Sequence, residues 1–279
     1  MKPPHNVAFL DRALRALSKT NEESVQLRRV MANVIVGQFM DGAVMRGGGS
    51  LKLRYGLTTT RYTMDFDAAR NVAEEVFVDR FNERLAAGWG DFSGRLVKGL
   101  KPKPKRPEPQ YVMQPFEVKL TYKNHPWCTV DFELSYDEVG DADAFDTVPL
   151  PRDVLEIFEK LNLPEPRPFP LMRVAHQIAQ KIHGATDPDY VRAQDIIDLQ
   201  LMMKRESVDR TEVRQICKRL FANRRKQSWP PKLEVSDEWR VTYAGMVGDI
   251  PVLPTVDEAV DWTNKLILEI DRAERNGDR

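Results

Sequence analysis

Two acidic residues separated by one position, Asp65 and Asp67, are the feature of the sequence that most clearly indicates chemistry. Residues 61–67 alternate between aromatic or methionine side chains and polar ones, so a strand there would place both carboxylates on one face, about 7 Å apart. Crowded like charges favour a hard divalent cation, so the pair predicts a Mg²⁺ or Mn²⁺ site. The alternative is two acids on a solvated strand face.

A cluster of three glycines, Gly47, Gly48 and Gly49, precedes the acidic pair and is followed by Ser50. Glycine allows positive φ and a close approach of the backbone to a ligand, and residues 50–55 can begin a helix whose N-terminal amides attract phosphate. Metal-assisted nucleotidyl transfer requires such a phosphate-binding turn together with paired carboxylates. The alternative for the glycines is a flexible turn.

A third carboxylate normally completes a metal site of this kind. Residues 129–134 alternate between polar and apolar side chains, which places Asp131 on the polar face of a strand. We predict Asp131 as the third metal ligand, with Glu133, two residues further along, as the alternative. Asp131 could also be an ordinary surface acid.

The elements that must position these residues follow from periodicity. Apolar residues at helical spacing predict two amphipathic helices in the first 40 residues and another over 70–87. Alternation predicts adjacent antiparallel strands over 116–122 and 129–134, preceded by a proline-rich loop at 101–109. From residue 151 the helical period returns, after turn residues at 140–151.

The order of elements therefore predicts an α+β protein. Residues 1–145 would form the core, with N-terminal helices and a small mixed sheet, and residues 146–279 would form a helical C-terminal domain.

Two sequence blocks resemble a known family. The run GGGSLKLRYG (47–56), followed by RYTMDFD (61–67), resembles the signature of the AbiEii/AbiGii-type nucleotidyltransferase toxins, of the DNA polymerase β-like superfamily. The block QIAQKIHGATDPDYVRAQDIIDLQLM (177–202) resembles that family's lysine-bearing helix and the acidic helix after it. In this match Lys181 takes the place of the lysine, Arg192 that of the arginine, and Asp195 and Asp198 those of the two acids.

The spacing of residues in the second block allows more than one role for its charged side chains. On a helix expected over 171–182, Lys181 lies at the edge of the apolar stripe, where its long stem could reach a cleft or cover an interface. Arg192, Asp195 and Asp198 recur every three residues, so they share one strip of a helix and could pair with one another. By the resemblance, one of the acids orders the active site, and we favour Asp195 as a partner of Lys181 or Arg192.

The resemblance and the residue patterns together give an expected site. The resemblance implies a polymerase β-like nucleotidyltransferase core whose helical C-terminal domain contributes to the nucleotide cleft. The expected catalytic residues are Asp65, Asp67, Asp131, Lys181 and Asp195; the expected nucleotide-binding residues are Gly47, Gly48, Gly49, Ser50, Arg61, Lys181 and Arg192; and the expected metal ligands are Asp65, Asp67 and Asp131. The chain departs from the family pattern in having Gly49 for a threonine and Gln194 for a lysine.

The resemblance also implies a function. It implies the toxin of a type IV, AbiE-like toxin–antitoxin or phage-defence pair, which would transfer a nucleoside monophosphate from an NTP to RNA, with a tRNA 3′ end as the expected acceptor. Its partner would be an AbiEi-like antitoxin. Two alternatives stay open: a nucleotidyltransferase that modifies a protein or small molecule, and a catalytically dead RNA-binding or regulatory protein of the same fold.

Composition limits the partners. Lysine plus arginine equals aspartate plus glutamate at 42 each, so only local basic segments, at 101–106 and 204–226, could track an RNA backbone, and a solvated surface is their default interpretation. No apolar run is long enough to span a membrane, so we expect no membrane partner. Residues 1–18 lack the apolar stretch of a secretory signal, and we therefore expect a cytoplasmic protein.

Overall fold

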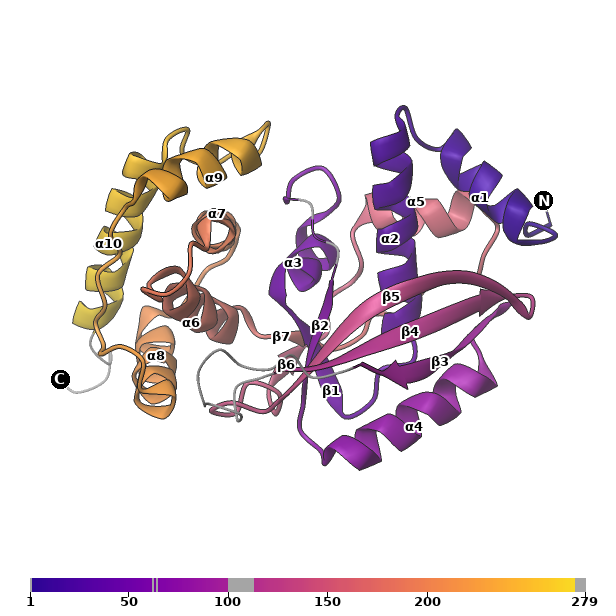
Figure 1. Ribbon diagram of the computed structural model, residues 1–279, viewed down its shortest axis with the longest axis horizontal. Helices are drawn as coiled ribbons and strands as arrows, with labels where there is room; N and C mark the ends of the chain where they lie inside the picture. The colour runs from indigo at the N-terminus through magenta and orange to yellow at the C-terminus, as the bar shows by residue number, and fades with distance from the viewer. Residues whose placement is uncertain (1, 62, 64, 100–112, 274–279) are drawn as a thin grey trace. The chain divides into compact units, whose positions relative to one another are not determined.

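A computed structural model of the chain describes residues 2–61, 63, 65–99 and 113–273 (Figure 1). Its contacts divide the chain into two units: Met1–Thr58 with Tyr62–Met172, and Thr59–Arg61 with Arg173–Arg279. The loop expected at 101–109 lies outside the described residues. Within the described part, none of the helices has the length and apolar character that crossing a membrane would require.

The first unit is built on a mixed sheet, with seven strands among the described residues in the order β3-β4-β5-β2-β1-β7-β6. Strand β2 runs parallel to β5 and β1 runs parallel to β7, whereas the other neighbours are antiparallel. The strands are β1 (Ala43–Arg46), β2 (Phe66–Arg70), β3 (Phe92–Lys98), β4 (Gln114–Tyr122), β5 (His125–Tyr136), β6 (Phe145–Asp146) and β7 (Leu171–Met172).

Helices α1 and α2 pack against β5, α4 packs along β3, and α5 packs against α2, while α3 contacts β1 and β2. Two of these helices begin at side chains that cap them: Asn6 accepts a hydrogen bond from the Phe9 amide in α1, and Thr20 accepts one from the Glu23 amide in α2. The five helices are α1 (Val7–Ala16), α2 (Asn21–Gly37), α3 (Gly47–Tyr55), α4 (Glu74–Ala87) and α5 (Arg152–Lys160).

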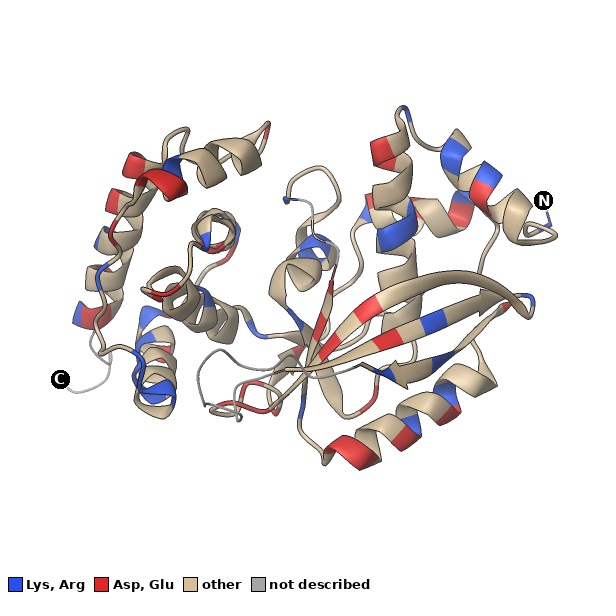
Figure 2. Ribbon diagram, viewed as in Figure 1, with Lys and Arg blue, Asp and Glu red and all other residues tan. Residues whose placement is uncertain are grey.

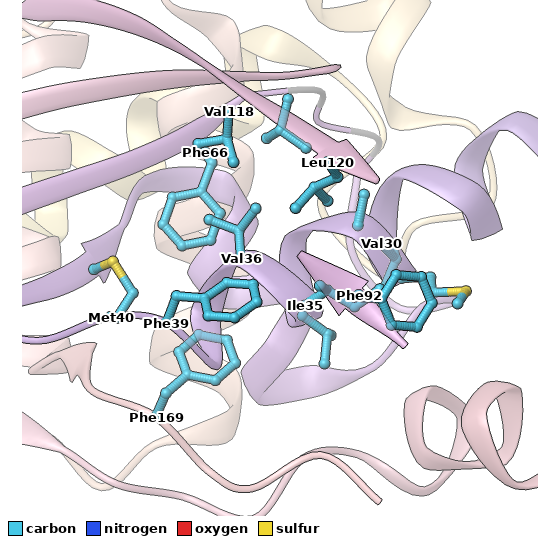
Figure 3. Close-up of a cluster of buried hydrophobic side chains, with 14 of the residues drawn as sticks. Val30, Ile35, Val36, Phe39, Met40, Phe66, Phe92, Val118, Leu120 and Phe169 are labelled. Carbon is cyan, nitrogen blue, oxygen red and sulfur yellow. The ribbon is translucent and has the colours of Figure 1, made fainter. Parts of the chain in front are cut away.

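The core of this unit is centred on the fully buried ring of Phe132 in β5. The rings of Phe66, Phe77, Phe81 and Phe116, from β2, α4 and β4, lie with their centroids 5.2 to 6.4 Å from it. The same cluster includes the apolar face of α2, as Figure 3 shows. Helices therefore cover the face of the sheet that carries Phe66 and Phe132, and the residues that alternate with them point to the other face.

The second unit is helical. Helix α6 packs against α7 and α8, and α7 also contacts α9 and α10. Helix α10 begins with a reciprocal capping box between Thr255 and Glu258, which satisfies amides at its first turn. The helices of this unit are α6 (Val174–Ala185), α7 (Ala193–Arg205), α8 (Arg210–Arg224), α9 (Asp237–Val247) and α10 (Val256–Arg272).

Three expectations from the sequence differ from the structure. The strand expected over 61–67 begins only at Phe66, because Thr59–Arg61 make their contacts with the second unit and pairing with β1 starts at Asp67. The helix expected from residue 171 begins at Val174, because Leu171 pairs with β1 as part of β7. The first unit extends to Met172 rather than 145, since α5 and β7 pack with its other elements.

Replacing Phe132 by alanine tests the role of the aromatic cluster. We expect Phe132→Ala to lower the free energy of unfolding by roughly 3 to 5 kcal/mol, because it opens a cavity among four aromatic neighbours. Phe145→Ala is the matched control: this ring in β6 is 47% exposed, and its loss should change stability by less than about 0.5 kcal/mol. Urea denaturation of both variants measures the difference, and equal losses would contradict the proposed centre of the core.

Candidate functional site

The three glycines directly follow β1 and form the first turn of α3, so the helix begins at Gly47 rather than at residue 50, where the sequence predicted its start. Gly47 has φ of +70°, in the left-handed region that favours glycine. Arg46, the N-cap residue, forms no side-chain capping hydrogen bond, and the first turn contains no acid. The positive end of the α3 dipole therefore has no counter-charge from its own first turn and suits an anion.

The hydroxyl of Ser50 lies inside this turn. It is fully buried and donates a 2.8 Å hydrogen bond to the carbonyl oxygen of Gly47. Ser50 was expected from the sequence to contact the nucleotide. In the structure it stabilises the first turn of α3, and the backbone amides of the glycines are donors that suit phosphate.

Asp67 lies directly against the glycine turn. A Cβ atom at Gly47 would overlap the Asp67 carboxylate, so only glycine at this position accommodates both the positive φ and the acid. Asp67 is also the register partner of Arg46, the residue before the turn. The structure thus places one acid of the predicted pair beside the start of α3.

The polar face of β2 and β5 gathers four carboxylates. Asp67 is the direct register partner of Glu133, and Phe66 is that of Phe132, which sets both acids opposite the aromatic core. Asp65 directly precedes β2 and Asp131 lies two residues before Glu133 on the same face of β5; both are exposed. Figure 2 shows acidic residues on these neighbouring strands.

Both burial and the neighbouring acids affect the pKa of Glu133. Burial raises the pKa of the Glu133 carboxyl, the charges of Asp67 and Asp65 raise it further, and the Arg46 guanidinium opposes the change. A cluster of carboxylate oxygens has the chemistry that suits a hard divalent cation. Among the described residues, however, no group of three Asp, Glu, His or Cys side chains is arranged to hold a metal ion.

Arg46 and Asp141 form a further charged pair that the sequence analysis missed. The two side chains are 12% and 1% exposed, and their closest charged atoms, Nη1 and Oδ2, are 3.9 Å apart. Burial raises the pKa of Asp141 to about 7, while Arg46 and the hydrogen bond from the Glu138 amide act in the opposite direction. Asp141 lies in a turn-rich loop whose sequence gives no sign of burial.

A chain of five alternating charges runs through the second unit. The Lys181 ammonium on α6 lies 2.8 Å from Asp195 Oδ1 and 2.7 Å from Asp198 Oδ2, both on α7. Arg192 donates from Nε to the other oxygen of Asp195 at 2.6 Å. Arg61 binds Asp198 through two hydrogen bonds, of 3.0 and 2.9 Å, from Nε and Nη2. Three cations and two carboxylates leave a net positive charge in the network.

This network fixes the charge state of its members. Burial alone would lower the pKa of Lys181, but Asp195 and Asp198 outweigh it, and the pKa of the lysine is raised. Burial alone would raise the pKa of Asp198, but Lys181 and Arg61 outweigh it, and the pKa of this acid is lowered. Both therefore remain charged around neutral pH.

The structure brings together the residues expected from the second sequence block, with two differences. Lys181 is buried rather than at the edge of the apolar stripe, and Asp198 makes as many contacts in the network as the favoured Asp195. Arg61 was expected to bind the nucleotide; in the structure its guanidinium holds Asp198. The regular three-residue spacing of Asp195 and Asp198 was the available signal for their equal roles.

Gly184 provides the space that this network needs. A Cβ atom at Gly184 on α6 would overlap Oδ2 of Asp195 and would lie 3.1 Å from Nε of Arg192. No role for Gly184 could be predicted from the sequence, because the approach of α7 to this point is a tertiary contact. Glycines at positions 47 and 184 thus serve the same purpose in the two units: each makes room for a carboxylate.

The buried Asp141 predicts a pH dependence of stability. Its folded pKa of about 7 exceeds the ordinary value of 3.8, so the stabilisation linked to its proton is complete below the ordinary value and is lost as pH rises through about 7. The loss corresponds to roughly 4 kcal/mol. We expect Asp141→Asn to match the wild type near pH 4 and to be more stable than it at pH 8 in urea denaturation.

Asp143→Asn is the control for this prediction, because Asp143 is exposed in the same loop. Its pH profile should follow that of the wild type. An Asp141→Asn profile parallel to the wild type between pH 4 and 8 would contradict the role assigned to Asp141.

Alanine at Gly184 tests the space around Asp195. We expect Gly184→Ala to lower the free energy of unfolding by about 1 to 3 kcal/mol, because the methyl group displaces the buried Asp195 carboxylate or its helix. Gly245→Ala in α9 is the control: nothing lies near the added methyl, so a gain of roughly 0.5 to 1 kcal/mol is expected from helix propensity. Urea denaturation distinguishes the two, and a stabilised Gly184→Ala protein would contradict the close approach.

Comparison with known proteins tests the family resemblance. The family model described as nucleotidyl transferase AbiEii toxin, of a type IV toxin–antitoxin system, matches residues 29–263. A solved structure of MenT4, a nucleotidyltransferase toxin from Mycobacterium tuberculosis H37Rv, is similar with a TM-score of 0.58 at 14% identity, covering 96% of this chain and 90% of that chain. JHP933 from Helicobacter pylori gives a TM-score of 0.44 at 14% identity, covering 91% and 94%. The search of curated proteins returned no match.

The family match includes the glycine turn, the acidic pair and the Lys181 network, and the MenT4 match shows that the fold is that of a nucleotidyltransferase toxin. The α+β nucleotidyltransferase fold and the family predicted from the two sequence blocks are therefore confirmed. The chain belongs to the AbiEii family of nucleotidyl transferase toxins of type IV toxin–antitoxin systems.

Proposed function

We propose that this nucleotidyltransferase toxin uses Mg²⁺ to transfer a nucleoside monophosphate from an NTP to RNA, with release of pyrophosphate and with the 3′ end of a tRNA as acceptor, and that an AbiEi-like antitoxin opposes it. The observation that carries the proposal is the contact between the two halves of the first sequence block. Gly47, at the start of α3, lies against the carboxylate of Asp67. A helix N-terminus suited to phosphate and an acid suited to a cation are therefore adjacent.

The residues of the first unit divide this work between them. The amides of Gly47, Gly48 and Gly49 bind the triphosphate, and Ser50 stabilises the turn that presents them. Asp65 and Asp67 hold the divalent cation, which when bound supplies charge neutralisation at the attacking and leaving oxygens.

For the third carboxylate, we favour Glu133 over Asp131. Glu133 is half-buried and is the direct register partner of Asp67, whereas Asp131 is exposed. The charges of Asp67 and Asp65 also affect the pKa of Glu133 more strongly than the charge of Asp131 does. A cation shared with Asp67 would relieve the repulsion that Glu133 experiences.

In the second unit, Lys181 takes an electrostatic role. Its raised pKa keeps it protonated, so it neutralises phosphate charge rather than accepting a proton. Asp195 and Asp198 hold the lysine in place. Arg192 in turn binds Asp195, and Arg61 binds Asp198.

The test is a transfer assay with total tRNA, Mg²⁺ and each α-labelled NTP in turn, resolved on a denaturing gel. We expect label in tRNA with the wild type, and a loss of about 100-fold or more for Asp67→Asn, because the cation loses a direct ligand. Glu133→Gln should show a similar loss and Asp131→Asn a much smaller one. Equal activity of the Glu133 and Asp131 variants would contradict the choice of third ligand.

Thermal melting shows whether each variant is folded. No label from folded wild-type protein with any of the NTPs would contradict transfer to RNA. Labelled protein or small molecules in a cell extract would then support the alternative acceptors, and the absence of any labelled product would support a catalytically inactive member of the family.

A further inference from the structure

A cavity of about 720 Å³ lies within the second unit, between α7, α8, α10 and the segment 251–254. Its size is in the range of small-molecule sites in proteins. One wall is the face of α10 on which Trp262, Lys265, Leu266 and Glu269 recur at helical spacing. None of the residues that were given a role in the proposed function lines this cavity.

Hydrogen bonds to Gln200 and Tyr243 hold the opposite wall in place. The Gln200 side chain accepts a 2.8 Å hydrogen bond from the Leu253 amide and donates a 3.2 Å hydrogen bond to the Tyr243 hydroxyl. Tyr243 in turn donates to the Leu253 carbonyl oxygen at 2.7 Å. Since these bonds fix the 251–254 segment from inside, the cavity is preformed.

The lining combines an aromatic surface with positively charged side chains. Among the described residues, Lys204 and Lys265 have no ion-pair partner, and the indole N–H of Trp262 has no acceptor. Arg210 on α8 and Glu269 on α10 form an ion pair at 3.2 Å, so their charges balance each other. The cavity therefore offers two lysines, an indole ring with a donor, and apolar walls that include Leu266 and Leu253.

This cavity is separate from the Lys181 network, although both involve α7. Asp198 and Gln200 are two residues apart, which on an α-helix places them roughly 200° apart around the axis. One face of α7 thus carries the buried acids, and the other carries the cavity. The lysines of the cavity are not needed to balance Asp195 or Asp198, which already have Lys181, Arg192 and Arg61.

We propose that the cavity binds one nucleotide unit, with the base stacked on Trp262 and the phosphate held by Lys204 and Lys265. Aromatic side chains beside lysines are the combination that binds single-stranded nucleic acid, through stacking and phosphate contacts. The nucleotide can be free or part of an RNA chain. The second case rests on the function proposed above and gives the acceptor RNA an anchoring site outside the reacting centre.

The chemistry favours a nucleotide over a peptide. An acidic peptide would use the lysines, but the 251–254 segment has its Leu253 amide and carbonyl groups committed to Gln200 and Tyr243, so it offers no backbone edge there for strand addition. A planar base needs no backbone partner and can use the indole face and its N–H.

The test measures binding alone, with the full-length Asp67→Asn protein in the absence of Mg²⁺ and NTP. The probes are a fluorescein-labelled single-stranded RNA hexamer of mixed sequence, followed by anisotropy, and the four nucleoside 5′-monophosphates, followed by calorimetry. We expect Trp262→Leu and Lys265→Gln each to raise the Kd by roughly tenfold, because each removes a stacking or phosphate contact. Lys204→Gln should act in the same direction.

Lys218→Gln is the matched control, because this exposed lysine on α8 lies outside the cavity and its replacement removes the same charge. It should leave the Kd within about twofold of the parent protein, a change expected of diffuse electrostatics. An equal loss for Lys218→Gln and Lys265→Gln would overturn the proposal, since binding would then follow net charge. Trp262-dependent binding of an acidic, leucine-rich peptide, without binding of either nucleotide probe, would also overturn it.

Weakening of the mononucleotides and the RNA together would support a site for one nucleotide unit from either source, and weakening of RNA alone would assign the site to the RNA chain. If Trp262→Leu has a much lower melting temperature than the parent protein, the Kd values of the Lys204→Gln and Lys265→Gln variants test the proposal, because both lysines are exposed. The binding assay does not depend on nucleotidyl transfer. Binding to the cavity by a protein that transfers no nucleotide would therefore contradict only the proposed function. Transfer without Trp262-dependent binding would contradict only this inference.

Discussion

The packing of Phe66 against Phe132 is the interaction on which the first unit and its site depend. The two residues are register partners in the parallel strands β2 and β5, and their rings stack with centroids 5.2 Å apart. Because side chains alternate along a strand, this pairing determines that Asp67 and Glu133 meet on the opposite face. A slip of one residue would turn the acids into the aromatic core, where their desolvation would cost several kcal/mol each. The energetics of the core therefore specify the geometry of the acids.

Burial of charge is the corresponding constraint in the second unit. Lys181, Asp195 and Asp198 are nearly inaccessible to water, and removing such groups from water is costly unless each has a close partner. The order of charges, with Arg192 and Arg61 at the two ends, gives each acid two cations. Removing one member would leave an uncompensated buried charge. The position of the Lys181 ammonium group is therefore determined by the two carboxylates of α7.

The sequence alone could predict the local parts of this arrangement. Helical and strand periods identified most elements, and the glycine turn, the acidic pair and the lysine helix were found from residue types and spacing. The parallel pairing of β2 with β5 joins segments far apart in the chain, and no local pattern encodes it. For this reason the choice between Asp131 and Glu133 could not be made from alternation, which places both on the same face.

For the same physical reason, the roles of Arg61 and Gly184 were not predicted. Arg61 lies four residues before Asp65 in sequence, yet its guanidinium binds Asp198, 137 residues away. Gly184 reads as an ordinary helical glycine until α7 is placed beside it. Helix α7 shows why such roles escape a sequence reading: polar residues on both of its faces are buried, Asp195 and Asp198 on one and Gln200 on the other. Amphipathic periodicity assigns polar residues to solvent, so a helix that buries a charge network and the wall of a cavity on opposite sides contradicts the assumption on which that prediction rests.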